Sequence, residues 1–64
     1  MTMKVKDVIE LLECNGWHLA RIRGDHRIYV KEGAQRPIVI PGHLKDDLAI
    51  GTLKSILKGA GLGI

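Results

Sequence analysis

Near its N-terminus the chain carries a stripe of apolar residues at helical spacing, formed by Val5, Val8, Ile9 and Leu12. Charged residues fall on the opposite side, so the pattern predicts an amphipathic helix over about residues 5 to 15. Asn15-Gly16 would end this helix, because glycine readily adopts the left-handed conformation that follows a helix C-terminus. Trp17 would then supply the apolar contact that accompanies such an ending.

The centre of the chain is typical of short strands separated by turns. Residues 17–23 are expected to form the first strand, although apolar and polar positions alternate imperfectly there. Gly24-Asp25 is a hairpin signal, because both residues tolerate positive φ. Residues 26–31 form the expected second strand.

This second strand alternates clearly, and its two faces hold Ile28 and Val30 on one side and Arg27, Tyr29 and Lys31 on the other. A third strand is predicted over residues 36–40, which are rich in β-branched side chains. Pro37 and Pro41 bracket it. Because proline cannot donate a backbone hydrogen bond, this strand is expected to be short and to lie at a sheet edge.

A polar loop over residues 41–47 leads to a second apolar stripe at helical spacing, formed by Leu53, Ile56, Leu57 and Ala60. Lys54 and Lys58 lie four positions apart on the exposed side of this expected helix. The predicted order over residues 1–64, a single domain, is therefore helix, three-stranded antiparallel meander, helix. This is an α+β fold in which both helices cover the same face of the sheet. The order is that of double-stranded-RNA-binding domains, which read the shape, phosphates and 2′-hydroxyls of RNA.

Positive charge is concentrated in the middle of the chain. The net charge of the 64 residues is +3, and the pI is about 9.4. Basic residues outnumber acidic ones between positions 21 and 36, where Arg21, Arg23, Arg27, Lys31 and Arg36 stand against Asp25 and Glu32. This excess either attracts a polyanion such as RNA or only solvates the strand faces, and charge alone gives the two interpretations equal weight.

The cysteine content and the lengths of the apolar runs limit the class of protein. Cys14 is the one cysteine, so no disulfide forms within the chain, and a reducing compartment, the cytoplasm, is expected. The first seven residues carry no apolar signal-peptide segment, and no apolar run is long enough to span a membrane. A domain of this size buries only about 60% of its unfolded surface, so a partner that covers part of it is expected.

The turn at residues 24–26 is the strongest candidate for chemistry, because it places His26 at the start of a strand among Arg21, Arg23 and Arg27. RNA carries its own nucleophile, the 2′-hydroxyl. Its cleavage needs a base, cationic groups for the phosphate and an acid for the leaving oxygen, and it needs no metal or other cofactor. Histidine suits the proton transfers and arginine binds phosphate oxygens. The competing interpretation is a half-exposed strand histidine without a function, and the tight turn and the arginine density weigh against it.

Three further residues are weaker candidates. Asp25 either holds the imidazole of His26 or is an ordinary hairpin residue, and the second interpretation is favoured. His43 either approaches His26 or only caps a turn, and His18 is expected at the surface of a strand. The spacing of the three histidines fixes no coordination shell, so no metal site is expected. The hydroxyl side chains of the second helix have no base near them in the sequence, so nucleophilic catalysis has no support.

Four segments resemble the HicA toxin family: residues 11–17 (LLECNGW), 24–29 (GDHRIY), 39–43 (VIPGH) and 51–61 (GTLKSILKGAG). They span nearly the whole chain in the family's order, and the combination is specific although each segment is short. HicA proteins are the small mRNA-cleaving halves of HicA–HicB toxin–antitoxin pairs. The chain departs from the family at Asp25, where members often carry serine, and at Leu44, where glycine is common.

The resemblance implies that His26 is the catalytic histidine of a metal-independent ribonuclease that cleaves mRNA and inhibits growth. It also implies a double-stranded-RNA-binding-domain-like fold and neutralisation by a HicB-type antitoxin. We expect this partner to cover the active face and to bury His26. Asp25 keeps a small polar residue in the turn, so the turn is expected to survive, whereas the loop conformation at Leu44 stays open.

Three hypotheses for the function follow. The favoured one is an RNA-cleaving toxin with His26 as the catalyst and RNA contacts at Arg21, Arg23, Arg27, Lys54 and Lys58. The second is a non-catalytic RNA-binding module that uses the same basic residues. The third is an interaction protein whose open sheet face binds only another protein. Cleavage of purified RNA separates the first from the second, and the arginines beside His26 argue against the third.

Overall fold

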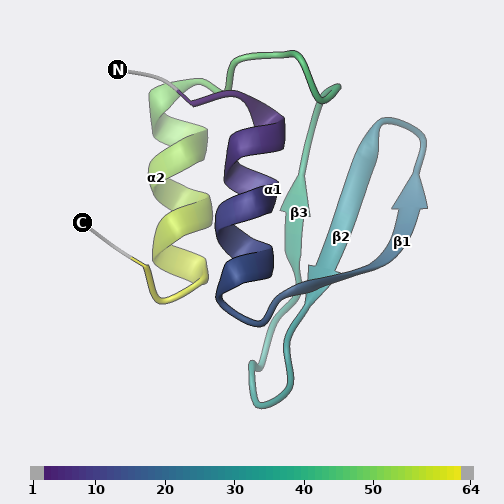
Figure 1. Cartoon of the computed structure of the whole chain (residues 1–64), viewed down its shortest axis with the longest axis vertical. Helices are drawn as coiled ribbons and strands as arrows, with labels where there is room; N and C mark the ends of the chain where they lie inside the picture. Colours follow the sequence, from purple (N-terminus) through teal and green to yellow (C-terminus); the bar gives the residue numbers. More distant parts are fainter. Residues whose placement is uncertain (1–2, 63–64) are drawn as a thin grey trace.

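The structure is a computed structural model that describes residues 3–62, in which two helices pack against three strands (Figure 1). In chain order the elements are α1 (Val5–Cys14), β1 (His18–Arg23), β2 (His26–Val30), β3 (Ile38–Ile40) and α2 (Ile50–Gly59). The strands pair antiparallel in the order β1-β2-β3. The predicted α+β class and its order of helix, meander and helix are confirmed.

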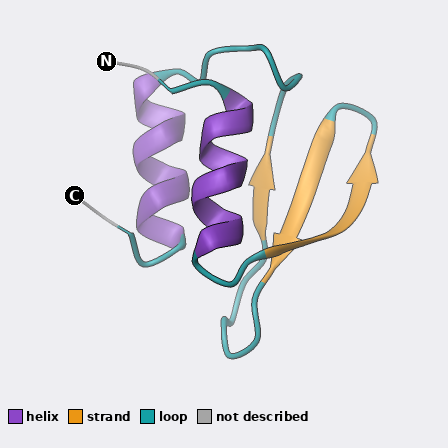
Figure 2. Ribbon diagram, viewed as in Figure 1, coloured by secondary structure: helices purple, strands orange, loops and turns teal. Residues whose placement is uncertain are grey.

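The helices cover only part of the sheet. Figures 1 and 2 show α1 and α2 side by side next to β3, with β1 at the far edge. All six residues of β1 are exposed. The core joins both helices to one face of β2 and β3, and it consists of Val5, Val8, Ile9, Leu12, Trp17, Tyr29, Ile38, Ile40, Leu48, Leu53, Ile56 and Leu57. The hairpin of β1 and β2 therefore extends beyond the helices into solvent.

The face of β2 that meets the helices carries Arg27 and Tyr29. Tyr29 pairs with Ile38 and Arg27 pairs with Ile40, and the tyrosine and both isoleucines are buried. The alternation read from the sequence is therefore correct, but Ile28 lies on the uncovered face. An aromatic ring buries a large apolar area, which favours the tyrosine over an aliphatic side chain at the core.

A Schellman motif ends α1, as the sequence predicted. Gly16 has a φ of +94°, in the left-handed region. Its N–H donates to the Glu13 carbonyl oxygen at 3.2 Å, and the N–H of Trp17 donates to the Leu12 carbonyl oxygen at 3.0 Å. The helix ends one residue earlier than predicted, at Cys14, because these two bonds already belong to its ending.

Gly16→Ala is expected to lower the free energy of unfolding by about 1–2 kcal/mol, because the left-handed conformation brings Cβ too close to the following carbonyl oxygen. Gly59→Ala is the matched control, since nothing lies within 4 Å of a Cβ added there. Alanine favours a helix over glycine, so this variant should gain about 0.5–1 kcal/mol. Urea unfolding followed by circular dichroism measures both changes. Equal midpoints for the two variants would contradict the strain assigned to Gly16.

The turn between β1 and β2 consists of Gly24 and Asp25. Arg23 pairs with His26 across it, and Gly24 has a φ of +60° whereas Asp25 has no positive φ. Positive φ at the first central position alone is the pattern of a type II′ turn, whose twist matches the flanking strands. The predicted hairpin is confirmed, and of its two turn residues only the glycine has positive φ. The turn makes His26 the first residue of β2.

The strand boundaries differ from the predicted ones by one or two residues. β1 begins at His18 rather than at residue 17, because the N–H of Trp17 is used in the ending of α1. β2 ends at Val30 rather than at residue 31. β3 begins at Ile38 rather than at residue 36, because Pro37 has no N–H to donate to β2.

Candidate active site

His26 lies on the open face of the sheet. Side chains alternate along β2, so His26 and Ile28 lie on one face of the strand and Arg27 lies on the other. The helices do not cover the face that carries His26 and Ile28. The side chain of His26 is 52% exposed. It lines a cavity of about 450 Å³ together with Thr52 and Ser55 of α2. The imidazole is therefore both accessible to solvent and next to another element.

The short length of β3 allows His26 to face α2. The pairing of β2 with β3 ends at Arg27 and Ile40, so His26 lies one residue beyond it, beside Pro41. Gly51 in the first turn of α2 lines the same cavity, and in the described part of the chain no side chain caps that end of the helix. The cavity is thus lined by an imidazole, by two hydroxyl side chains and by a helix end whose N–H groups lack intrahelical partners.

Asp25 contacts His26 without a hydrogen bond. Its Oδ1 is 3.9 Å from the imidazole Nδ1, which is too long for a hydrogen bond, and its side chain is 61% exposed. Exposed pairs of this kind contribute little to stability. The geometry fits an ordinary turn residue better than a group that fixes the orientation of the imidazole.

Two arginines share the face of His26. Arg23 lies opposite His26 in the pairing of β1 with β2, and Arg21 lies opposite Ile28, and both arginines are exposed. Within residues 3–62 no ion pair or hydrogen bond engages either guanidinium. Two cationic groups are therefore free on the imidazole's side of the sheet.

Arg27 points to the helix side instead. Its Nη1 donates a hydrogen bond to the Gly42 carbonyl oxygen at 3.1 Å. Gly42 belongs to the loop between β3 and α2, so this contact ties the loop to β2 directly after His26. This hydrogen bond is the contact that the structure shows for Arg27, and its role as an RNA contact stays a prediction.

A buried tyrosine lies on the other face of the same strand. Burial raises the pKa of Tyr29, the carboxylate of Glu13 adds to this increase, and the guanidinium of Arg27 opposes it. The phenol is therefore protonated at neutral pH. It is not a candidate base for the site, since it also lies on the face opposite His26.

Other candidate features are few in residues 3–62. No group of three or more His, Cys, Asp or Glu side chains is positioned there to hold a metal ion. No helix in the same range is long and apolar enough to cross a membrane. Cys14 is a free, exposed thiol at the end of α1.

Nearly the whole chain matches one known protein family. A family model for the HicA toxin of bacterial toxin–antitoxin systems matches residues 5–62. The chain belongs to the HicA toxin family. No curated protein matches it. This HicA chain is therefore a toxin of a toxin–antitoxin system, with an antitoxin as partner, from a family known for ribonuclease-like activity.

Thr52 and Ser55, which line the cavity together with His26, were not predicted from the sequence to be part of a site. Their separation of three positions places them on one face of α2. Both fall in residues 51–61, one of the segments that resemble the family, and this was the available signal. Only the packing of α2 beside β3 brings them to His26, and this packing is not visible in the local pattern.

His43 lies outside the His26 cavity of this HicA chain. It is exposed in the loop between β3 and α2, and its N–H donates to Asp46 Oδ2 at 3.1 Å. It is not among the residues that line the cavity with His26. The side chain of Asp46, and not the imidazole of His43, therefore caps this turn, and any part of His43 in catalysis stays a prediction.

Lys54 and Lys58 of α2 do not line the cavity. The residues of α2 that line the cavity are Gly51, Thr52, Ser55 and Ile56. At about 100° of rotation per residue, Lys54 lies roughly 100° from Ser55, whereas Lys58 lies roughly 60° from Ser55 and further along the helix, and both lysines are exposed. Any contact that they make with RNA lies outside the cavity.

Proposed function

We propose that this HicA chain is an endoribonuclease that cleaves mRNA with His26 as its catalytic histidine, requires no metal and inhibits growth. The observation that carries the proposal is the cavity in which the half-exposed imidazole faces α2, with Arg21 and Arg23 free on the same sheet face. An open site with a proton acceptor and fork-shaped cationic donors suits a phosphodiester. A HicB-type antitoxin is the proposed partner, which neutralises the toxin by covering this face.

The proposed reaction uses the 2′-hydroxyl of the RNA as its nucleophile. The imidazole of His26 accepts the hydroxyl proton while the 2′ oxygen forms a bond to the adjacent phosphorus. The bond from phosphorus to the 5′ oxygen breaks, that oxygen takes a proton from water and leaves as a 5′-hydroxyl, and the proton held by His26 returns to the solvent. The products are a 2′,3′-cyclic phosphate and a 5′-hydroxyl end, so the reaction is balanced without another reactant.

Stabilisation of the phosphate charge is the second requirement of this reaction. Negative charge grows on the non-bridging oxygens as the fifth bond to phosphorus forms, and preorganised donors lower its energy. Arg21 and Arg23 supply planar guanidinium donors from the open sheet face. Thr52 and Ser55 supply hydroxyl donors from α2. The lysines of α2 are assigned to parts of the RNA that extend past the cavity.

Incubation of purified RNA with the purified chain in EDTA tests this proposal against a non-catalytic RNA-binding module. The chain is expected to shorten the RNA on a denaturing gel, with and without the chelator. RNA that is retained at unchanged length would contradict ribonuclease activity and support the binding module. Cleavage that EDTA abolishes would contradict the metal independence.

A further inference from the structure

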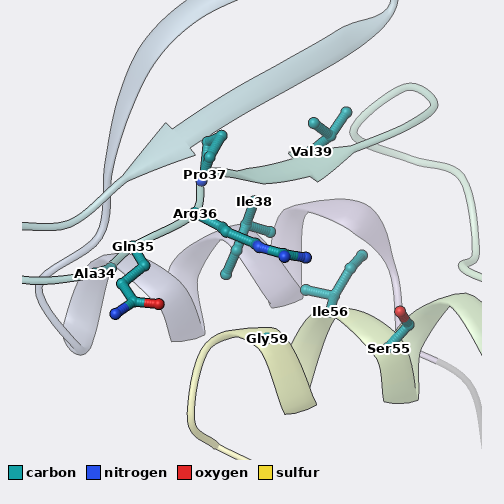
Figure 3. Close-up of a pocket in the computed structure, with 9 residues that line it drawn as sticks. All are labelled: Ala34, Gln35, Arg36, Pro37, Ile38, Val39, Ser55, Ile56 and Gly59. Atoms are coloured by element: carbon teal, nitrogen blue, oxygen red, sulfur yellow. The ribbon is translucent and has the colours of Figure 1, made fainter.

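A groove runs along β3 and α2 past the His26 cavity. A second cavity, of about 480 Å³, adjoins the first and shares Val39, Ser55 and Ile56 with it. Ala34 and Gln35 lie at its far end, and the side chain of Arg36, just before β3, extends from there toward Ile56 (Figure 3). The two cavities together form the β3–α2 groove, which leads from His26 at one end past Arg36 to Gln35 at the other.

Arg36 enters this groove with an unpaired charge. Figure 3 shows its side chain extended between β3 and α2. Within residues 3–62 no hydrogen bond or ion pair engages its guanidinium. None of the residues that line the two cavities is acidic. An anion beside Arg36 would therefore meet a free cation, whereas the Asp25 carboxylate lies at the His26 end of the groove, 3.9 Å from the imidazole.

The remaining lining of the groove suits a nucleotide chain. Gln35, Thr52 and Ser55 offer hydrogen-bonding groups along its length. Pro37 and the 46%-exposed Val39 offer apolar surface for bases at the rim of the groove, on the side of β3 that points away from α2 (Figure 3). Proteins that bind single strands combine a cationic groove that follows the backbone with apolar contacts to the base faces. The β3–α2 groove has both components.

The groove's length and width indicate how the RNA lies. Arg36 and Pro41, which lines the His26 cavity, are five residues apart, so their backbones are separated by at most roughly 17 Å. Arg36 therefore binds a phosphate that flanks the cleaved one. Neighbouring elements pack roughly 10 Å apart, which leaves too little width between one strand and one helix for a duplex.

We propose that the β3–α2 groove binds single-stranded RNA and that Arg36 binds a phosphate flanking the cleavage point. This inference rests on the proposed function for the position of the cleaved phosphate at His26. The inference gives Arg36 a different role from the arginines of β1, because Arg36 lines the groove and those arginines do not. Recognition through a backbone phosphate and base faces is tolerant of RNA sequence.

Binding of 2′-O-methyl RNA tests the groove independently of cleavage, because this RNA lacks the free 2′-hydroxyl. Fluorescent oligonucleotides of increasing length, beginning with a dinucleotide, are titrated at several salt concentrations with the wild type, Arg36→Ala, Arg36→Lys and Lys6→Ala. Lys6 provides the matched control, since it is an exposed cation of α1 that lines neither cavity. Fluorescence anisotropy gives the binding constant for each length.

Arg36→Ala is expected to weaken binding of the long oligonucleotides by roughly five- to tenfold and to leave binding of the dinucleotide unchanged. The slope of the logarithm of the binding constant against the logarithm of salt concentration should become shallower by about 0.7, the value for one phosphate contact on a single strand. Arg36→Lys should retain most of the slope, because lysine keeps the charge. Lys6→Ala should match the wild type.

Four results would overturn the groove: no loss of affinity in Arg36→Ala at any length, an equal loss for the dinucleotide, the same loss in Lys6→Ala, or an equal loss for a blunt duplex of the same sequence. The proposed function fails in a different way. A wild type that binds these oligonucleotides through Arg36 but leaves ordinary RNA uncut would overturn the ribonuclease and support the groove.

Discussion

His26→Ala is expected to abolish growth arrest in cells that express the chain and to slow cleavage of purified RNA by about 10²–10⁴-fold. The substitution removes the proposed proton acceptor but leaves the free guanidinium groups of Arg21 and Arg23 on the same face. RNA should therefore still bind. The side chain of His26 is half-exposed and makes no hydrogen bond within residues 3–62, so the fold should be unchanged.

His18→Ala is the matched control for this experiment. His18 is an exposed histidine of β1 that lines neither of the cavities at the groove. Its variant should arrest growth as the wild type does, and both variants should unfold at the temperature of the wild type. Growth arrest by His26→Ala that equals that of the wild type would show that His26 is not the catalyst.

Leu12→Ala is expected to lower the free energy of unfolding by about 2–5 kcal/mol. Leu12 is fully buried, at 0% exposure, in the core face of α1. At roughly 0.05–0.15 kcal/mol per residue, the whole domain has a stability of only about 3–10 kcal/mol. The loss therefore unfolds a large part of the population, and growth arrest should weaken although His26 is untouched.

Leu44→Ala makes the same truncation at the surface. Leu44 is 45% exposed in the loop between β3 and α2, so its variant should change the free energy of unfolding by no more than about 0.5 kcal/mol. Urea unfolding of the two variants and the wild type gives the comparison. Equal midpoints for Leu12→Ala and Leu44→Ala would contradict the assignment of the α1 stripe to the core.

The parts of the fold that depend on local chemistry were predictable from the sequence. Gly16 marks the end of α1 and Gly24 the hairpin, because both positions need the positive φ that glycine adopts most readily. The helical stripes predicted the core faces of both helices for the same local reason. Alternation separates the two faces of β2 but does not say which of them the helices cover. The aliphatic Ile28 lies on the uncovered face, whereas Tyr29 on the other face is buried.

The candidate site likewise has residues that could be predicted from the sequence and residues that could not. His26 and the arginines of β1 lie within a few residues of one turn, so the sequence alone brings them together. Thr52 and Ser55 are far from that turn in the sequence and reach it only through the packing of α2 beside β3. Arg36 was visible as one of several basic residues, but its place in a groove depends on the same packing.

The chemistry of the cut ends tests the central claim most directly. In the proposed reaction His26 takes the proton of the 2′-hydroxyl, and attack by this hydroxyl leaves characteristic ends on the RNA. The wild type is incubated in EDTA with an RNA oligonucleotide and with the same oligonucleotide carrying a single 2′-deoxy nucleotide on the 5′ side of the cut. Mass spectrometry should find a 2′,3′-cyclic phosphate and a 5′-hydroxyl in the first and no cleavage at that position in the second. A 5′-phosphate end, together with equal cleavage of the deoxy-substituted oligonucleotide, would contradict catalysis through the 2′-hydroxyl.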